Sequence, residues 1–358
     1  MTFGVKRYFI YLAYHFFKNF LIILGGISLA FAVIDYFQHA RELEDSFNIN
    51  ILYIFYMWQE ALALLYPLAL VFALIMTKLT LVKNSNMAVL YAFGFSTSRL
   101  FTPFLTVATA VYILFLGLHT TSFSYAKENA ESLLHNEIGA YLQDDLFFKY
   151  NDTFVYIKNL DPVNKVINDM TIFKVTNNQI DYVMHSKRSV FNGESWDAYD
   201  VDLKTHHHKE GNLINYDESK IVSIKALEGY KPKVIESLYD GKALTIHDSF
   251  DTWMVLFKEG INSDKIRASF YEKVVMPLFA LFLMAILFSW IPFYGRFADF
   301  SKTTATSLGV TFLVWGVIFG LHQLGTNSVI SPELTSLLPI VLLAFYTSYR
   351  YKKEYAPS

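Results

Sequence analysis

Residues 20–34 read FLIILGGISLAFAVI, without a charged side chain, inside the longer apolar segment 16–37. A helix needs about 20 mostly apolar residues to cross the ~30 Å hydrocarbon core of a bilayer. The segment is too long for the apolar part of a signal peptide, which has about 7–15 residues, and no small-residue cleavage site follows it. The sequence therefore predicts a membrane-spanning helix here.

Further apolar segments of similar length predict more spans. They cover residues 51–77, 100–121, 274–291, 305–324 and 334–349. Only 17% of the residues are charged, whereas a soluble domain has roughly 25%. We therefore expect an α-helical membrane protein with six transmembrane helices, three before and three after an inserted domain. Prolines within these spans are tolerated because neighbouring helices re-satisfy the freed backbone groups.

The middle of the chain has the composition of a soluble domain. We expect residues 1–122 to hold the first three spans, 123–268 the inserted domain and 269–358 the last three spans. The inserted domain contains short β-like runs separated by turn signals such as Asn192-Gly193, which predict an antiparallel sandwich or partial barrel. The runs cover residues 154–157, 170–175, 180–184, 196–201 and 221–224.

Two helical pieces flank these predicted strands. One, near residues 124–136, would extend the third span. The other, residues 249–258, would begin after Asp248 and end at Gly260, because an acidic residue before a helix and a glycine after it are common boundary signals.

The distribution of Lys and Arg near the span ends predicts the orientation. Eleven of these residues flank one side, whereas the opposite short loops, 39–50 and 325–333, contain only Arg41. Because cytoplasmic loops carry the excess of positive charge, we expect both termini in the cytoplasm and the inserted domain in the periplasm. The eleven are Lys6, Arg7, Lys18, Lys78, Lys83, Arg99, Arg296, Lys302, Arg350, Lys352 and Lys353.

Several classes of chemistry find no support in the sequence. The absence of cysteine excludes disulfides, thiolate metal sites and a cysteine nucleophile. No nucleotide-binding, zinc-protease or serine-hydrolase motif occurs, and a net charge of −2 does not suggest nucleic acid. We therefore expect no catalytic site, no metal and no cofactor, and any energy must come from a partner. The run His206–His208 is interpreted as a solvated hairpin end, with a metal site as the alternative.

Two acidic residues lie in or near the predicted spans. Glu60 is about ten residues into the second span and Asp35 is near the outer end of the first. An intramembrane carboxylate is a candidate functional residue. The alternatives are that Asp35 reaches the outer interface and that Glu60 pairs with a polar neighbour. A membrane enzyme would require one of these residues to be essential for turnover.

The loop between the second and third spans predicts a short cytoplasmic helix. Ser85 would cap its start and Gly94 would end it. Its apolar residues could dock into another protein or pack against the loop's own helix bundle. The candidate docking residues are Asn86, Met87, Leu90 and Tyr91.

The order of spans and several local motifs resemble the LptF/LptG permease family of the lipopolysaccharide export ABC transporter. The resemblance covers nearly the whole chain, and the span-four region favours the LptG type. The matching motifs are Arg7-Tyr8-Phe9-Ile10, Pro67, Ala92 with Gly94-Phe95-Ser96, Gly260, Lys273 with Pro277, Pro292-Phe293 with Arg296, Gly309, and Pro332 with Pro339.

The resemblance implies a permease subunit of the bacterial inner membrane with a periplasmic β-jellyroll-like domain. The implied partners are a paralogous permease subunit, an ABC ATPase dimer, a periplasmic bridge or LptC-like protein, and lipopolysaccharide itself. The docking helix departs from the family pattern, because Asn86 replaces a glutamate that usually pairs with an arginine of the ATPase. This departure leaves open an alternative function as a non-transporting receptor or assembly scaffold.

Lipopolysaccharide carries phosphates above its acyl chains, so a binding site needs cations at the outer ends of the spans. The best candidate is Lys273, which matches the family's K-x-x-x-P motif. The other candidates are Arg41, Lys265 and Arg267. The alternative is that these residues are interfacial anchors that reach lipid headgroups.

Overall fold

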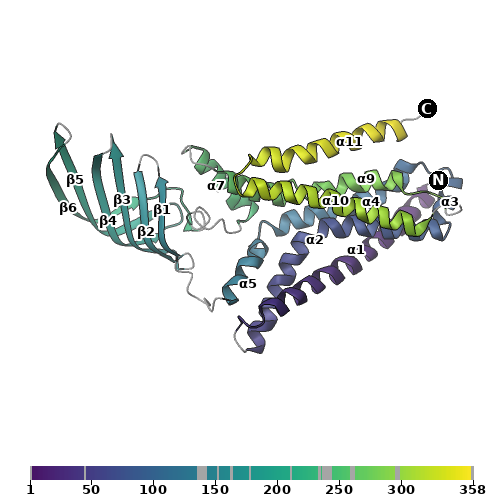
Figure 1. Ribbon diagram of the computed structural model, residues 1–358, viewed down its shortest axis with the longest axis horizontal. Helices are drawn as coiled ribbons and strands as arrows, with labels where there is room; N and C mark the ends of the chain where they lie inside the picture. Colours follow the sequence, from purple (N-terminus) through teal and green to yellow (C-terminus); the bar gives the residue numbers. More distant parts are fainter. Residues whose placement is uncertain are drawn as a thin grey trace. The chain divides into compact units, whose positions relative to one another are not determined.

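The computed structural model divides into two compact units, which are described separately (Figure 1). The helical unit comprises Met1–Glu131 and Arg267–Ser358, and the sheet unit comprises Ser132–Ile266. The structure describes residues 2–43, 46–134, 143–150, 153–161, 164–176, 179–209, 212–232, 235, 244–258, 263–294 and 299–355.

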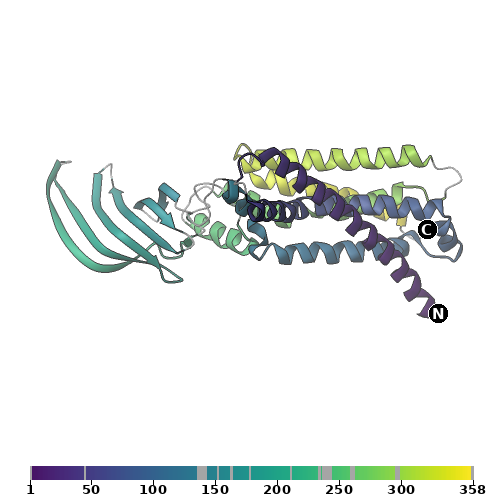
Figure 2. The same cartoon turned by 90° about the horizontal axis from the view of Figure 1, so that it is seen from below.

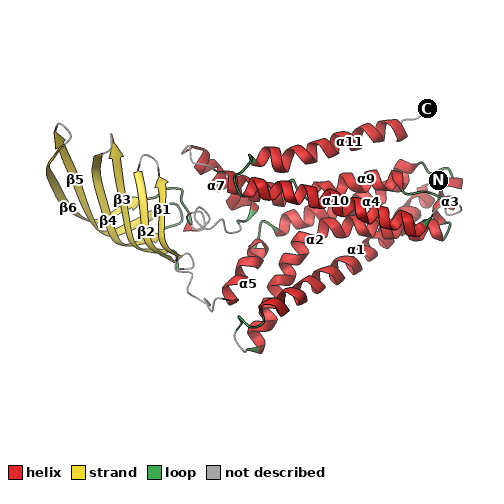
Figure 3. Cartoon of the chain, viewed as in Figure 1, coloured by secondary structure: helices red, strands yellow, loops and turns green. Residues whose placement is uncertain are grey.

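Long helices dominate the helical unit, whereas all the described strands lie in the sheet unit (Figure 3). Two short helices, α5 and α8, cross the boundary between the units. The helices that lie at least partly in the helical unit are α1 (Thr2–His39), α2 (Phe47–Lys83), α3 (Asn86–Ala92), α4 (Thr97–Leu118), η1 (Ser122–Tyr125), α5 (Ala126–Leu134), α8 (Asp264–Val274), α9 (Leu278–Trp290), α10 (Phe300–Thr326), η3 (Glu333–Leu337) and α11 (Leu338–Tyr355).

Four of these helices, α1, α2, α4 and α10, are long and apolar enough to cross a membrane. A fifth span is formed if α8 and α9, which meet at a bend of 42°, are taken together. The sixth predicted span falls on η3 and α11. It does not qualify by length and composition within the described residues, because α11 has 18 residues and ends in the polar sequence RYKKEY.

The bend between α8 and α9 lies at Pro277, where the helical hydrogen-bond ladder is interrupted. Proline lacks a backbone N–H and therefore leaves a carbonyl of the preceding turn without its helical donor. The hydroxyl of Tyr112 in α4 donates to the carbonyl of Val274 at 2.7 Å. A neighbouring helix thus satisfies a carbonyl at the break, as a broken helix within a membrane requires.

Polar side chains join α1 and α2 at three levels. The amide of Asn19 donates to Thr77 at 2.8 Å, and the indole N–H of Trp58 donates to Ser28 at 2.9 Å. Near the C-terminal end of α1, the Tyr53 hydroxyl donates to the Asp35 carboxylate at 2.6 Å. Along these three contacts the residue numbers increase in α1 and decrease in α2, so the two helices are antiparallel.

The centre of the bundle is α2, which contacts α1, α3, α4, α9 and α10. Aromatic packing supports its contact with α4, since the rings of Tyr66 and Phe115 stack with centroids 4.0 Å apart. The buried core draws on α1, α2, α4 and α9, with Met87 from α3, Ile318 from α10 and Ile340 from α11.

Close packing between α10 and η3 depends on Gly325. A Cβ atom at this position would clash with the hydroxyl of Thr335 and lie 3.3 Å from its Cβ. Gly325→Ala should therefore destabilise the purified chain by about 1–3 kcal/mol, as overpacking usually does, and lower its unfolding temperature in detergent. Adding Thr335→Ala should restore part of the loss. The control is Gly320→Ala in the same helix, where the added Cβ has no neighbour within 4 Å; equal effects at both glycines would contradict the packing argument.

The sheet unit contains one antiparallel sheet with strand order β1-β2-β3-β4-β5-β6. Every pair of neighbours in the sheet is also consecutive in sequence, so the described strands form a meander that curves along its length (Figure 2). This curved single sheet agrees with the predicted partial barrel better than with a two-layer sandwich. The strands are β1 (Gln143–Tyr150), β2 (Thr153–Asp161), β3 (Val166–Thr176), β4 (Gln179–Phe191), β5 (Trp196–Lys209) and β6 (Asn212–Ala226).

Local sequence signals explain the hairpin between β4 and β5. The predicted turn at Asn192-Gly193 is confirmed, with Gly193 at φ 106° and the Asn192 side chain accepting from the backbone N–H groups of Glu194 and Ser195. Trp196 begins the next strand; it is fully buried, and its indole N–H donates to the carbonyl of Tyr230 at 2.7 Å.

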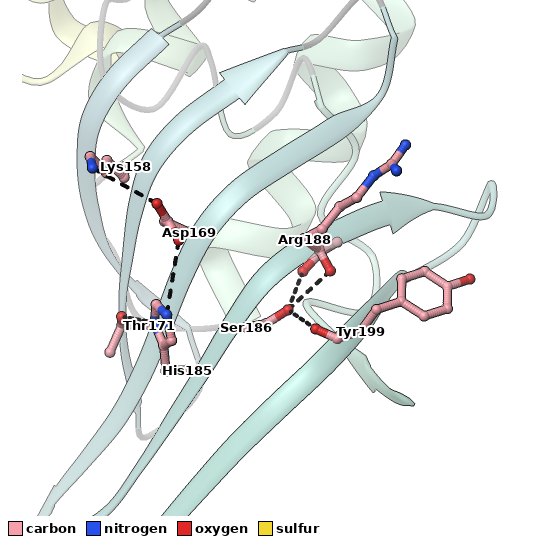
Figure 4. Close-up of polar contacts among 8 residues, drawn as sticks. Lys158, Asp169, Thr171, His185, Ser186, Arg188 and Tyr199 are labelled. Carbon is pink, nitrogen blue, oxygen red and sulfur yellow. Dashed lines mark hydrogen bonds and ion pairs between the residues drawn. The ribbon is translucent and has the colours of Figure 1, made fainter. Parts of the chain in front are cut away.

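Asp169 marks an irregularity in β3, since its φ is 55°. Aspartate tolerates this left-handed conformation better than most residues. Its carboxylate lies 3.8 Å from Lys158 in β2 and 3.9 Å from His185 in β4 (Figure 4). Beside it, the buried Ser186 hydroxyl is 2.9 Å from the carbonyl of Tyr199. Such contacts join β2, β3, β4 and β5 where the strands curve.

Two predicted helices differ from the structure in their boundaries. The piece after the third span does not extend it, because α4 ends at Leu118 and a turn precedes η1 and α5. The other piece is α7 (Ile246–Lys258). It begins before Asp248, because Thr245 caps it by accepting from the Asp248 backbone N–H at 3.1 Å while its hydroxyl donates to the Asp248 carboxylate. The predicted end at Gly260 lies outside the described residues.

Candidate docking and substrate sites

The short helix α3 forms between α2 and α4, as the sequence predicts. Gly94 ends this segment with φ 79°, a conformation that suits glycine. Ser85 precedes the helix but does not cap it, because its φ is 61° and its side chain makes no capping hydrogen bond. The reason is the tight turn after α2, in which the Ser85 backbone N–H donates to the carbonyl of Val82.

The predicted docking residues of α3 mostly face the bundle to which α3 is attached. Met87 is fully buried, and Leu90 and Tyr91 pack against the same core. The outward residues are Val89 and Phe93, which are 51% and 76% exposed. Of the two predicted alternatives, burial against the loop's own bundle therefore applies to Met87, and any docking surface on α3 is centred on Val89 and Phe93.

Asn86 and Tyr91 join α3 to other parts of the helical unit. The amide of Asn86 donates to the hydroxyl of Tyr11 in α1 at 3.1 Å. Tyr91 is hydrogen-bonded to Thr97, the first residue of α4, and the edge of its ring contacts Phe293 with centroids 4.8 Å apart. The orientation of α3 is thus fixed by α1, α4 and the segment that follows α9.

Lys78 is a functional candidate that the sequence analysis assigned to a cytoplasmic loop. The structure corrects this, because α2 continues to Lys83 and the Lys78 side chain is fully buried. Its ammonium donates to the carbonyls of Phe288 and Ile291, the latter at 2.6 Å. The signal that could have revealed it is the apolar sequence on both sides, IMTKLTLV over residues 75–82.

Lys273, the best candidate for a substrate-binding residue, lies in the last turn of α8 and is buried. Its ammonium is 3.5 Å from the hydroxyl of Ser269. It also interacts electrostatically with Glu60 in α2 and with Glu272. The predicted substrate-binding lysine thus interacts with a carboxylate of α2, Glu60, and with a second carboxylate, Glu272, beside it in α8.

The other three candidate cations have surroundings that differ from those of Lys273. Arg267 forms an ion pair with Glu333 of η3, which also accepts from the Tyr271 hydroxyl at 3.2 Å. Arg41 is exposed in the turn after α1. Lys265 is exposed near the start of α8.

The two carboxylates predicted to lie in or near the spans, Asp35 and Glu60, have different surroundings. Asp35 accepts from the Tyr53 hydroxyl and lies 3.4 Å from the ring of His39, so it takes part in the contact between α1 and α2. Glu60 is partly buried; it interacts electrostatically with the like-charged Glu272 and with the opposite charges of Lys127 and Lys273. Asp35 thus has a structural explanation, whereas Glu60 is linked to a candidate site residue.

A buried histidine, His322 of α10, was not predicted as a site residue. Its ring nitrogens are 3.0 Å from the hydroxyl of Ser336 and 3.7 Å from the carboxylate of Glu272. It therefore connects α8, α10 and η3 beside Lys273. Within the described residues there is no cluster of His, Cys, Asp or Glu that could hold a metal ion; the side chains of His207 and His208 lie outside those residues.

The comparison with known protein families matches this architecture. The model of the lipopolysaccharide export system permease LptF/LptG matches residues 10–353, nearly the whole chain. The chain belongs to the LptF/LptG permease family. No individually curated protein matches it.

Membership of the LptF/LptG family gives the features above a general role. The family comprises permeases of lipopolysaccharide export, which agrees with long apolar helices and an inserted β domain. The matching model covers the LptF and LptG types together. The match also extends over α3 and the segment around Lys273, so both candidate sites lie within the part of the chain that the family shares.

Proposed function

We propose that this chain is one permease subunit of an ATP-driven lipopolysaccharide exporter in the bacterial inner membrane. It would work with a paralogous permease subunit and an ABC ATPase dimer, and pass the lipid to a periplasmic bridge or LptC-like protein. The observation that carries the proposal is the family match over residues 10–353. The chain itself contains no nucleotide-binding motif, so ATP hydrolysis is assigned to the partner.

Two sites divide the work in this proposal. Docking to the ATPase is assigned to α3, whose exposed Val89 and Phe93 offer an apolar surface, with Asn86 at the start of the helix. Recognition of lipid phosphate is assigned to Lys273, which combines a positive charge with a mostly apolar surrounding bundle. The two sites are separated along the bundle by α9.

The test is ATP-driven release of lipopolysaccharide from proteoliposomes by the purified complex. The native complex should release lipid only when ATP is present. A complex that hydrolyses ATP without releasing lipid would contradict the proposal. It would favour the alternative function as a receptor or assembly scaffold. That alternative is supported by Asn86, which is hydrogen-bonded to Tyr11 and stands where the family usually has a carboxylate for the ATPase.

The same proposal predicts the orientation of the chain. The beginning of α1 and the end of α11 lie at the same end of the helical unit as α3 (Figures 1 and 2), and the excess of Lys and Arg assigns that end to the cytoplasm. The native chain has no cysteine, so single cysteines can be labelled without background. In cells with an intact inner membrane, an impermeant thiol reagent should label Lys187→Cys, an exposed position in β4. The reagent should not label Lys83→Cys, an exposed position beside α3; the reverse pattern would invert the topology.

A further inference from the structure

Lys78 is a buried lysine whose terminal nitrogen is held by one end of a helix. Charged side chains within membrane segments are costly and usually face a polar partner. Here the ammonium donates to the carbonyls of Phe288 in the last turn of α9 and of Ile291, its C-terminal capping residue. The last carbonyls of a helix have no partner within it and carry its partial negative charge. Lys78 of α2 thus caps the C-terminal end of α9.

The same ammonium also covers an aromatic ring that α3 touches. It lies 3.8 Å from the ring centroid of Phe293 and 4.4 Å from that of Phe288, distances at which a cation is attracted to the ring face. The edge of the Tyr91 ring in α3 meets Phe293 at 4.8 Å. Phe293 is therefore in contact with the docking helix and with the cation that caps α9.

These contacts form a short path between two parts of the bundle. Tyr91 belongs to α3, and Phe293 follows α9 by three residues. At its other end α9 begins after Pro277, at the bend that follows Lys273. A displacement of α3 toward or away from the bundle would act on Phe293 and then, through the Lys78 cap, on the whole of α9.

We propose that Lys78 and Phe293 are positioning residues that make α9 follow the movement of α3, so that ATP hydrolysis in the partner reaches the lipid-binding end of the bundle. This inference rests on the proposed function. Neither residue touches lipid or nucleotide in this mechanism. Their effect is on the amount of lipid released for each ATP hydrolysed.

The experiment measures that ratio in proteoliposomes containing the full complex and labelled lipopolysaccharide. Lys78→Met keeps the length and apolar stem of the side chain but removes the donors and the charge. We expect it to lower the ratio about tenfold, within the range usual for coupling between two sites. Lys78→Arg retains donors and a cation that stacks on rings, and should give a ratio close to that of the native chain.

Phe293→Leu provides an independent test that leaves the cap in place. It keeps an apolar side chain but removes the ring between Tyr91 and Lys78, and should also lower the ratio. The matched control is Lys302→Met in α10. Lys302 is exposed, and its backbone N–H donates to Asp299, a contact that the substitution leaves intact. This control should release as much lipid for each ATP as the native complex does.

Each outcome decides the inference. A lowered ratio in every one of the two variants, Lys78→Met and Phe293→Leu, that still assembles with the ATPase supports it. A native ratio in either assembled variant overturns it, and so does failure of both variants to assemble, because the contacts would then serve stability alone. Failure of the proposed function is distinct: it would appear in the native complex as ATP hydrolysis without lipid release.

Discussion

Phe93→Asp should release the ATPase from the purified complex without unfolding the permease. Phe93 is 76% exposed, so a charge there is tolerated while α3 faces water. In a docked complex the same carboxylate would be buried without a partner, which costs at least about 3 kcal/mol and weakens binding by roughly a hundredfold or more. Val89→Asp should act in the same way. The measurement is the amount of ATPase that co-purifies with each variant.

Two further variants separate docking from folding. Met87→Asp should lower the yield of folded permease, because this side chain is fully buried in the bundle core. Asn86→Glu should preserve or strengthen binding, since it restores the carboxylate that the family usually presents to an arginine, and such charge-assisted hydrogen bonds are strong. If both Val89→Asp and Phe93→Asp retain the ATPase at native levels, α3 is not the docking element.

Lys273→Ala should abolish most lipid release from proteoliposomes while leaving the complex assembled. A hydrogen bond between an ammonium and a phosphate is worth roughly 1.5–3 kcal/mol, or about a ten- to hundredfold effect on binding. Lys273→Arg retains the charge and should transport. If Lys273→Ala releases lipid as well as the native chain, the residue is only an anchor.

The electrostatic interaction between Lys273 and Glu60 allows a sharper version of this test. The lysine could instead act as the counter-charge of that carboxylate, since the two interact electrostatically. In that case Glu60→Gln, which removes the negative charge, should restore transport to Lys273→Ala. If Lys273 binds lipid phosphate, the double variant stays defective, and Glu60→Gln alone has a smaller effect. Restored transport in the double variant would contradict the assignment of Lys273 to the substrate.

The sequence predicted those features that depend on neighbouring residues. Four apolar helices long enough to span the membrane, and the turns at Gly94 and Asn192-Gly193, follow from local composition and backbone preference. Helix boundaries were less predictable, because capping by Thr245 moves the start of α7 to Ile246. The sixth predicted span shows the same difficulty, since the apolar part of α11 is short and the helix ends in polar residues.

The predicted α3 illustrates where sequence alone stops. Its existence and its end at Gly94 follow from the local sequence, and the family resemblance assigns it a docking role. Which residues face outward is decided by the helix bundle, which covers Met87 and leaves Phe93 exposed. A seven-residue helix with apolar residues on several sides carries no unambiguous buried face in its own sequence.

By itself the sequence determined the class of this protein: a chain of apolar helices around an inserted β domain, with a strong excess of positive charge on one side. Local physics suffices for this, because hydrophobic length and turn preference act within a few residues. Only the tertiary structure decided how the charges inside the bundle are used. Lys78 meets carbonyls 210 and 213 residues away, and Lys273 interacts electrostatically with Glu60 of another helix. The stability of a buried charge depends on such distant partners, which no local pattern encodes.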